Sequence, residues 1–162
     1  TVEALGVDTA IASRHVDHIF ADDIVTFAPS QSPTLMESAN LWYKALDAIL
    51  DDTENKQSRM TVTGTPWSTG DVYKGIIDNN DLSTAEGIPP EFSFYIRPAI
   101  ENGQSIWSER FSLDRFKRIE FNLRGTGRWE LNYMCQYTDG ANNDLKTSWL
   151  QPFQYRNGVI YV

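Results

Sequence analysis

The chain has 162 residues, with 14 lysines and arginines against 22 aspartates and glutamates, and a net charge of -8. Hydrophobic residues make up 41% of the sequence and aromatic residues 12%, which excludes a wholly disordered chain and allows one domain with its own core. A single cysteine and two histidines exclude an internal disulfide and a Cys/His zinc site, and no apolar run approaches the ~20 residues that a membrane-spanning helix needs.

The first third of the chain predicts two strands followed by a helix. Residues 1–7 predict a short strand, and residues 18–21 predict a buried strand because they form a mostly apolar run that stops at two charges. Residues 27–31 predict a loop. Ser32 and the proline after it provide an N-cap and a first-turn proline for an amphipathic helix over 33–50, whose apolar residues recur at steps of three and four.

A third strand and a second helix follow a polar loop. Residues 60–63 alternate in polarity and stop at Gly64, which predicts a short strand. Residues 72–77 place an apolar face on a short helix, and residues 78–90 predict an acidic loop. Because the order is strand, helix, strand, helix, the sequence predicts parallel strands in an α/β fold.

The C-terminal part predicts shorter elements. Residues 92–96 alternate as another strand, and Ser112 caps a helix that begins at the next residue. Residues 129–137 predict a further helix. Residues 155–162 predict a hairpin, because Asn-Gly stands where the turn would be.

Asp22 and Asp23 are candidate catalytic residues because they follow a predicted strand directly. Ligands of α/β sheets bind at the carboxyl ends of the strands. In nucleotide hydrolysis, one carboxylate at such a position holds the water shell of a magnesium ion, and its neighbour orients the attacking water. Asp22 would take the first role and Asp23 the second. The alternative is a solvated pair of aspartates that opens a loop.

The next predicted strand ends in hydroxyl groups and a turn. Residues 61–67 have the sequence Thr-Val-Thr-Gly-Thr-Pro-Trp. Their hydroxyl groups and the turn are candidates to contact a γ-phosphate or to report its loss; the alternative is an ordinary strand of high β-propensity followed by a turn. The candidate residues are Thr61, Thr63, Gly64, Thr65 and Trp67.

Taken in this order, the motifs resemble those of one family: the large terminase subunits of tailed bacteriophages, the ATPases that package DNA into procapsids. The adjacent Asp22 and Asp23 resemble the family's Walker B motif. Residues 61–67, followed by 71–73, resemble its coupling motif and the helix after it. The resemblance depends on order and spacing rather than on any single motif.

The resemblance implies a partial P-loop NTPase-like fold in two parts. Residues 1–100 would form the C-terminal part of an ATPase domain with parallel core strands. Residues 101–162 would form a helical linker region and a C-terminal hairpin that lead toward a nuclease domain. Residues 105–111 and 129–137 are similar to the family's passage between these two domains.

The resemblance also implies an activity and its partners. The family hydrolyses ATP with Mg²⁺, which assigns Asp22 to the metal, Asp23 to catalysis and residues 61–67 to nucleotide contact and coupling. Arg14 would reach the nucleotide of a neighbouring subunit; the alternative is an ordinary surface arginine. The implied partners are double-stranded DNA, a portal protein and a small terminase subunit, in a homo-oligomeric motor without a membrane anchor, in the cytoplasm of the infected bacterial host.

The sequence also departs from the family. No glycine is followed by lysine, so the Walker A phosphate loop, Gly-x-x-x-x-Gly-Lys-Ser/Thr, cannot be written in it. We therefore expect this chain alone not to hydrolyse ATP, and we expect the acidic cluster of the nuclease to be absent as well. The rival hypothesis is a non-enzymatic split or truncated terminase fragment, a binding module whose partner chain supplies the phosphate loop. A third hypothesis is an acidic binding domain unrelated to terminases.

Basic residues concentrate in one stretch. Residues 110–128 contain six of the chain's 14 lysines and arginines. This pattern fits either contact with a DNA backbone or a helix with a solvated charged face. The sequence therefore assigns no residue to DNA binding.

Overall fold

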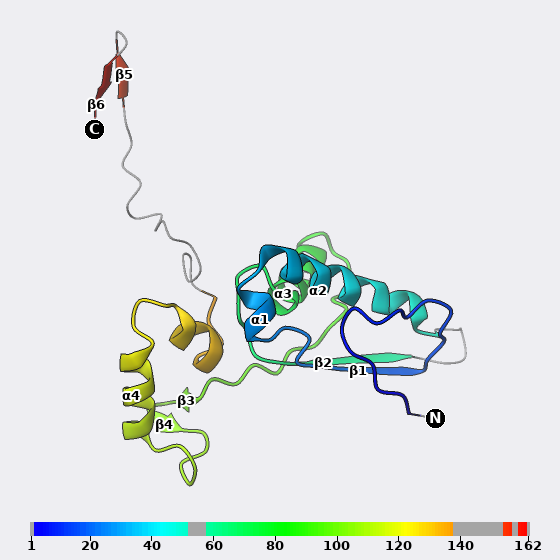
Figure 1. The fold of residues 1–162 in the computed structure, drawn as a ribbon, viewed down its shortest axis with the longest axis horizontal. Helices are drawn as coiled ribbons and strands as arrows, with labels where there is room; N and C mark the ends of the chain where they lie inside the picture. The colour runs from blue at the N-terminus through cyan, green and yellow to red at the C-terminus, as the bar shows by residue number, and fades with distance from the viewer. Residues whose placement is uncertain (1, 52–57, 138–153, 157–158, 162) are drawn as a thin grey trace.

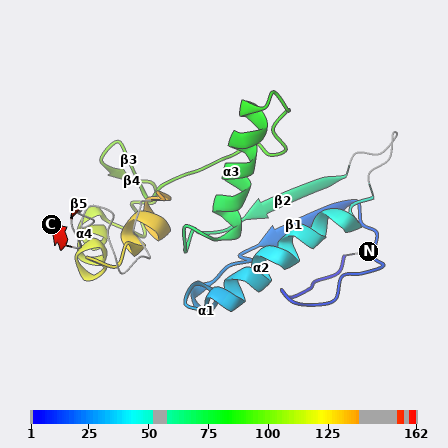
Figure 2. The same ribbon diagram turned by 90° about the horizontal axis from the view of Figure 1, so that it is seen from above.

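A pair of parallel strands with three helices on one side forms the N-terminal part of the molecule (Figure 1; Figure 2). The computed structural model describes residues 2–51, 58–137, 154–156 and 159–161. Among these residues the strands are β1 (His18–Asp22), β2 (Arg59–Thr63), β3 (Ile100–Glu101), β4 (Gln104–Ser105), β5 (Gln154–Arg156) and β6 (Val159–Tyr161). The helices are α1 (Phe27–Ser30), α2 (Pro33–Leu46), α3 (Val72–Ala85) and α4 (Leu113–Asn122), with single turns η1 (Asp47–Ile49) and η2 (Trp129–Tyr133).

The pairing of β1 with β2 is parallel, with Asp22 opposite Thr63 in the register. This confirms a mixed α/β fold with parallel strands. The helices α1, α2 and α3 lie on the same side of the pair, and Ala21 is buried against them in the core (Figure 1). Phe20 points to the other side and is 66% exposed. The strand predicted over 18–21 is confirmed as β1, but the prediction that it is buried is wrong, because no described element covers its second face.

The helix α2 begins where the sequence predicts. The Ser32 hydroxyl accepts a hydrogen bond from the Leu35 N–H at 3.4 Å, and a proline occupies the first turn. From Met36 to Ile49 the apolar residues at steps of three and four face the core, whereas Leu35 is exposed. With η1 continuing it, α2 confirms the helix predicted over 33–50. The loop predicted over 27–31 is instead the short helix α1.

The helix α3 is longer than the sequence predicts. A helix over 72–77 followed by a loop over 78–90 was expected, but α3 extends well into that range. The polar residues after 77 lie mostly on its exposed side, so they do not interrupt it. The helix ends in a Schellman motif: Gly87 has a φ of +75°, and the Ile88 N–H donates to the Ser83 carbonyl at 2.8 Å.

Asn80 connects α3 to the segment that follows it. Its side chain, 6% exposed, donates to the Phe92 carbonyl and accepts from the Phe92 N–H at 3.2 Å. These bonds occupy backbone groups that a strand would need, and Phe94 and Ile96 remain exposed. The strand predicted over 92–96 is therefore wrong, because its apolar residues have no core to pack on.

Two further predicted elements differ from the structure. Residues 2–7, the described part of the strand predicted over 1–7, form no strand, and the apolar Leu5 and Val7 are exposed. The helix predicted over 129–137 is a single turn, η2. The chain leaves the helical path because Cys135 adopts a φ of 52°, in the left-handed region.

The C-terminal part has its own cluster of aromatic rings. The Ser112 side chain caps α4, as the sequence predicts. Phe111 stacks on Phe116 with ring centroids 5.5 Å apart, and Trp129 stacks on Tyr133 at 5.1 Å. The antiparallel pair of β5 and β6 confirms the strands of the predicted hairpin, whose Asn-Gly turn lies outside the described residues.

The Asn80→Ala substitution should destabilise the protein by about 1–3 kcal/mol, because it leaves the Phe92 N–H and carbonyl without their partner in a partly buried place. Asn79→Ala is the matched control: Asn79 is the adjacent residue of α3 and is exposed. We expect its effect to stay within about 0.5 kcal/mol. Urea unfolding of both variants measures the difference, and equal midpoints would contradict the anchoring role of Asn80.

Candidate functional site

The carboxyl ends of β1 and β2 bring two of the predicted site residues into contact. The Thr63 hydroxyl donates a hydrogen bond to Asp22 Oδ1 at 2.5 Å. The Asp23 N–H donates to the Thr63 carbonyl at 3.0 Å, which continues the parallel pairing one residue beyond β1. The two motifs, which lie 41 residues apart in sequence, therefore form one cluster at the edge of the sheet.

A sharp backbone turn keeps both aspartates at the surface. Asp23 has a φ of 47°, in the left-handed region, which Asp tolerates better than most residues. Directly after it, Ile24 and Val25 are buried, at 4% and 0% exposure. The turn thus sends the next two side chains into the core while Asp22 and Asp23 stay exposed.

Tyr73, on the first turn of α3, packs beside Thr63 and Gly64 at the carboxyl end of β2. Its hydroxyl lies 3.5 Å from the Thr63 carbonyl. A Cβ atom on Gly64 would overlap the Tyr73 ring and hydroxyl, so any other residue there would force the Tyr73 ring to move. Burial above all, together with the charges of Asp23, Asp71 and Asp22, raises the pKa of Tyr73 to about 12, and a hydrogen bond with the Val25 backbone opposes this rise.

The turn between β2 and α3 is organised around the buried carboxylate of Asp71, which is 2% exposed. Its Oδ2 accepts from the N–H groups of Trp67 and Ser68, at 2.8 Å and 3.1 Å. Its Oδ1 accepts from the Lys74 N–H at 2.9 Å, which caps α3, and from the Tyr137 hydroxyl at 3.1 Å. Burial, and then the charge of Asp71, raise the pKa of Tyr137 above its usual value.

The same turn contacts the segment around η2. The Asn132 side chain donates to the Pro66 carbonyl. Trp67 meets the ring of Phe27 edge-on at 6.1 Å, and the Arg128 guanidinium lies 4.7 Å above that ring. Trp67 thus packs against the core, and Phe27 lies between it and Arg128 of the C-terminal part.

Two other predicted site residues lie away from Asp22. Thr61 stands two residues before Thr63, about 7 Å further along the strand, and its hydroxyl lies 3.5 Å from the His18 ring. Arg14 precedes β1, at the opposite end of that strand from the aspartates, and forms an ion pair with Glu3. No contact of Thr65 with this cluster is observed in the described part of the chain.

The edge offers oxygen atoms and no other metal-ligating chemistry. Among the described residues, no group of three or more His, Cys, Asp or Glu side chains is placed to hold a metal ion. Asp22 and Asp23 contribute carboxylates, and Thr63 contributes a hydroxyl. A hydrated Mg²⁺ ion suits such a set, because Mg²⁺ prefers oxygen ligands and retains most of its water.

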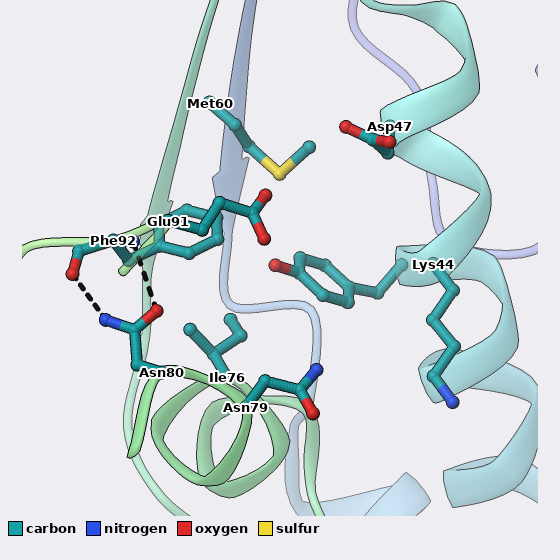
Figure 3. Close-up of a pocket in the computed structure, with 9 residues that line it drawn as sticks. Lys44, Asp47, Met60, Ile76, Asn79, Asn80, Glu91 and Phe92 are labelled. Carbon is teal, nitrogen blue, oxygen red and sulfur yellow. Dashed lines mark hydrogen bonds between the residues drawn. The ribbon is translucent and has the colours of Figure 1, made fainter. Parts of the chain in front are cut away.

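A cavity of about 180 Å³ lies between α2 and α3, on the face of the β1–β2 pair that the helices cover (Figure 3). Glu91 and Asp47 approach it from opposite walls, and Met60 of β2 points into it. Burial, and then Glu91 and Asp47, raise the pKa of Tyr43 in its wall to about 12. Because Met60 and Asp22 occupy opposite faces of the sheet, this cavity is separate from the strand-end site.

Comparison with known proteins gives no further assignment: the chain matches no family model, and no curated protein matches it significantly. The described helices include none that is long and apolar enough to cross a membrane.

Sequence reasoning missed the supporting residues of the site. Asp71 stands directly before an apolar helical pattern, which is the signal of an N-cap and could have been used. Nothing in the sequence indicates that Tyr137 reaches it from 66 residues away. The contact of Gly64 with Tyr73 is also invisible before the fold is known.

Gly64→Ala should destabilise the protein by about 1–3 kcal/mol, because the added methyl group overlaps the Tyr73 ring. Gly75→Ala is the matched control: Gly75 lies inside α3, and nothing stands within 4 Å of the added atom. That control should gain up to about 1 kcal/mol from helix propensity. Thermal unfolding of both variants measures the contrast, and two variants that shift in the same direction would refute the close approach.

Raising the pH through the range from 10 to about 12 should destabilise the protein through Tyr73. Its pKa is raised in the folded state, so the contribution is complete below the unfolded value and is lost as pH rises to the folded one. Tyr73→Phe should flatten this part of the stability curve, whereas Tyr95→Phe, at a side chain 84% exposed, should not. Urea unfolding at successive pH values tests this, and parallel curves for all three proteins would contradict it.

Proposed function

We propose that the chain is part of the ATP-hydrolysing motor of a phage terminase large subunit, which drives double-stranded DNA into the procapsid. The observation that carries the proposal is the hydrogen bond from Thr63 to Asp22 across the carboxyl ends of adjacent parallel strands. The two motifs whose order resembles the family's Walker B and coupling motifs thus meet at the edge where α/β sheets bind ligands. The finer fold, a partial P-loop NTPase-like domain, belongs to the same proposal.

In this proposal Asp23 acts as the base that orients the attacking water. Its side chain is exposed at the strand end, where a terminal phosphate would lie. Asp22 and Thr63 would hold hydrated Mg²⁺, which supplies neutralisation of the charge on the phosphate oxygens. Thr63 also fixes the Asp22 carboxylate by its hydroxyl, so a group that competes for this carboxylate also perturbs Thr63.

The coupling role is assigned to the turn after β2. Thr63 leads through Gly64 into the turn that Asp71 holds, and that turn contacts the segment around η2 through Pro66. A displacement of Thr63 after phosphate release would therefore reach the C-terminal part through two hydrogen-bonded contacts, the second between Asp71 and Tyr137. Thr61, Thr65 and Trp67 belong to the same proposed coupling element.

The remaining roles complete the proposal. Arg14 would act on the nucleotide of a neighbouring subunit, since it lies far from the Asp22 cluster of its own chain. A homo-oligomeric motor, a portal protein, a small terminase subunit and the cytoplasm of the infected bacterial host are the setting in which such a subunit works.

The alternative is a non-enzymatic fragment whose partner chain supplies the phosphate loop. Two observations favour completion by other segments: one face of the β1–β2 pair is open, and within the described residues neither strand has a second neighbour. Parallel sheets are ordinarily covered on both faces. Both hypotheses predict that the chain alone does not turn over ATP.

Asp23→Asn, introduced into the complete protein that carries a phosphate loop, should lower ATP turnover by at least about 100-fold and spare ATP binding. The amide keeps the shape of the side chain but cannot accept a proton. Steady-state phosphate release and binding of a fluorescent ATP analogue measure the two effects separately.

Asp81→Asn is the control for this experiment, because Asp81 lies exposed in α3, away from the strand ends. Near-normal turnover of Asp23→Asn would remove Asp23 from the mechanism. If no assembly containing the unaltered chain hydrolyses ATP, the enzyme hypothesis fails and the binding module replaces it.

A further inference from the structure

Basic side chains gather on one exposed part of a chain that is otherwise strongly acidic. Residues 110–128 carry six basic and two acidic side chains, a net charge of +4, whereas the rest of the chain carries eight basic and 20 acidic ones. Five of the six basic residues are exposed on α4 and on the segments directly before and after it, and we use the name α4 basic face for this set: Arg110, Arg115, Lys117, Arg118 and Arg124.

Aromatic rings, rather than carboxylates, hold most of these arginines. The Arg115 guanidinium lies 4.6 Å above the centroid of Phe111, and that of Arg124 lies 5.0 Å above Phe121. Arg110 stacks on Trp107 at 4.9 Å. A stacked guanidinium is oriented in advance and keeps N–H groups at its edge for another acceptor.

The positive charge of this face is only partly compensated by nearby carboxylates. Within the described residues, the one ion pair that involves the face joins Lys117 to Asp114 at 3.5 Å, and both side chains of that pair are highly exposed. Such a pair contributes little and is easily exchanged. Arg118 has no carboxylate partner in this part of the chain.

We propose that the α4 basic face binds the phosphate backbone of double-stranded DNA. Guanidinium groups match phosphate oxygens bidentately, and duplex DNA presents about one charge per 1.7 Å of its axis, a regular line of acceptors. The acidic surface of a second copy of this chain is the competing polyanion, but its carboxylates are interspersed with basic residues. Binding of this kind is independent of base sequence and sensitive to salt.

This inference deepens the proposed function and takes from it only the choice of DNA as the polymer. It involves none of the residues at the carboxyl ends of β1 and β2. A measurement without ATP therefore tests it separately from hydrolysis: the Asp23→Asn variant can fail to hydrolyse ATP whether or not this face binds DNA.

The test compares the full chain with the double variant Arg118→Glu/Arg124→Glu by fluorescence anisotropy of a labelled duplex, at increasing sodium chloride and without nucleotide. Each phosphate contact contributes about 0.9 to the slope of log K against log salt. Loss of two contacts should lower that slope by about 2 and weaken binding at low salt by at least about tenfold.

The matched control is Lys44→Glu/Arg59→Glu, which makes the same change in total charge at two exposed residues of α2 and β2. It should bind DNA far better than the first variant. If the charge-reversing variant Arg118→Glu/Arg124→Glu does not fold, the neutral variant Arg118→Gln/Arg124→Gln is used in its place. The proposal would be overturned if the DNA affinity of the wild type did not depend on salt concentration, or if both double variants lost the same amount of DNA affinity. The proposal would also be overturned if Arg118→Glu/Arg124→Glu bound DNA normally but sedimented differently from the wild type. That result would indicate that this face contacts a second copy of the chain.

Discussion

The buried carboxylate of Asp71 is the constraint on which the strand-end region depends. A charge that is 2% exposed is costly to bury, and four hydrogen bonds offset this cost. Two of the donors are backbone N–H groups of the turn after β2, one is the Lys74 N–H in the first turn of α3, and one is the hydroxyl of Tyr137. Because a single side chain satisfies all four, the turn, the helix and the C-terminal part cannot move independently without exposing a buried charge.

In the proposed coupling, this arrangement lets the turn transmit a displacement. Gly64 lies close to the Tyr73 ring, and Thr63 before it is held by hydrogen bonds with Asp22 and Asp23. A change at the Asp22 carboxylate therefore has two outcomes: the Thr63 hydrogen bond breaks, or the turn moves as a unit with Asp71. The second outcome moves the contact to Tyr137, which is the physical content of the proposed coupling.

The sequence predicts those parts of the molecule whose causes are local. Ser32 and Ser112 cap helices by their own hydroxyls, and the order of strands and helices indicated the parallel strands whose carboxyl ends carry Asp22 and Thr63. The failures have tertiary causes. Residues 78–85 continue α3 although their composition is that of a loop, because Asn80 finds its partners only in the folded chain. The strand over 92–96 fails for the same reason, and the distance of Arg14 from the aspartates depends on the direction of β1.

The exposure of the strand-end site limits what it can do in isolation. Electrostatic catalysis of phosphoryl transfer needs a site from which water is excluded, because charges interact weakly in bulk water. Asp22 and Asp23 lie on the surface, and Phe20 beside them on the open face of β1 is 66% exposed. A segment that brings a phosphate loop to this edge must therefore also cover the open face, since supplying phosphate contacts alone would leave the attacking water in competition with solvent. A strand paired with a free edge of the β1–β2 pair extends the row of carboxyl ends but covers neither face, so the added segment must also place a helix on the open face.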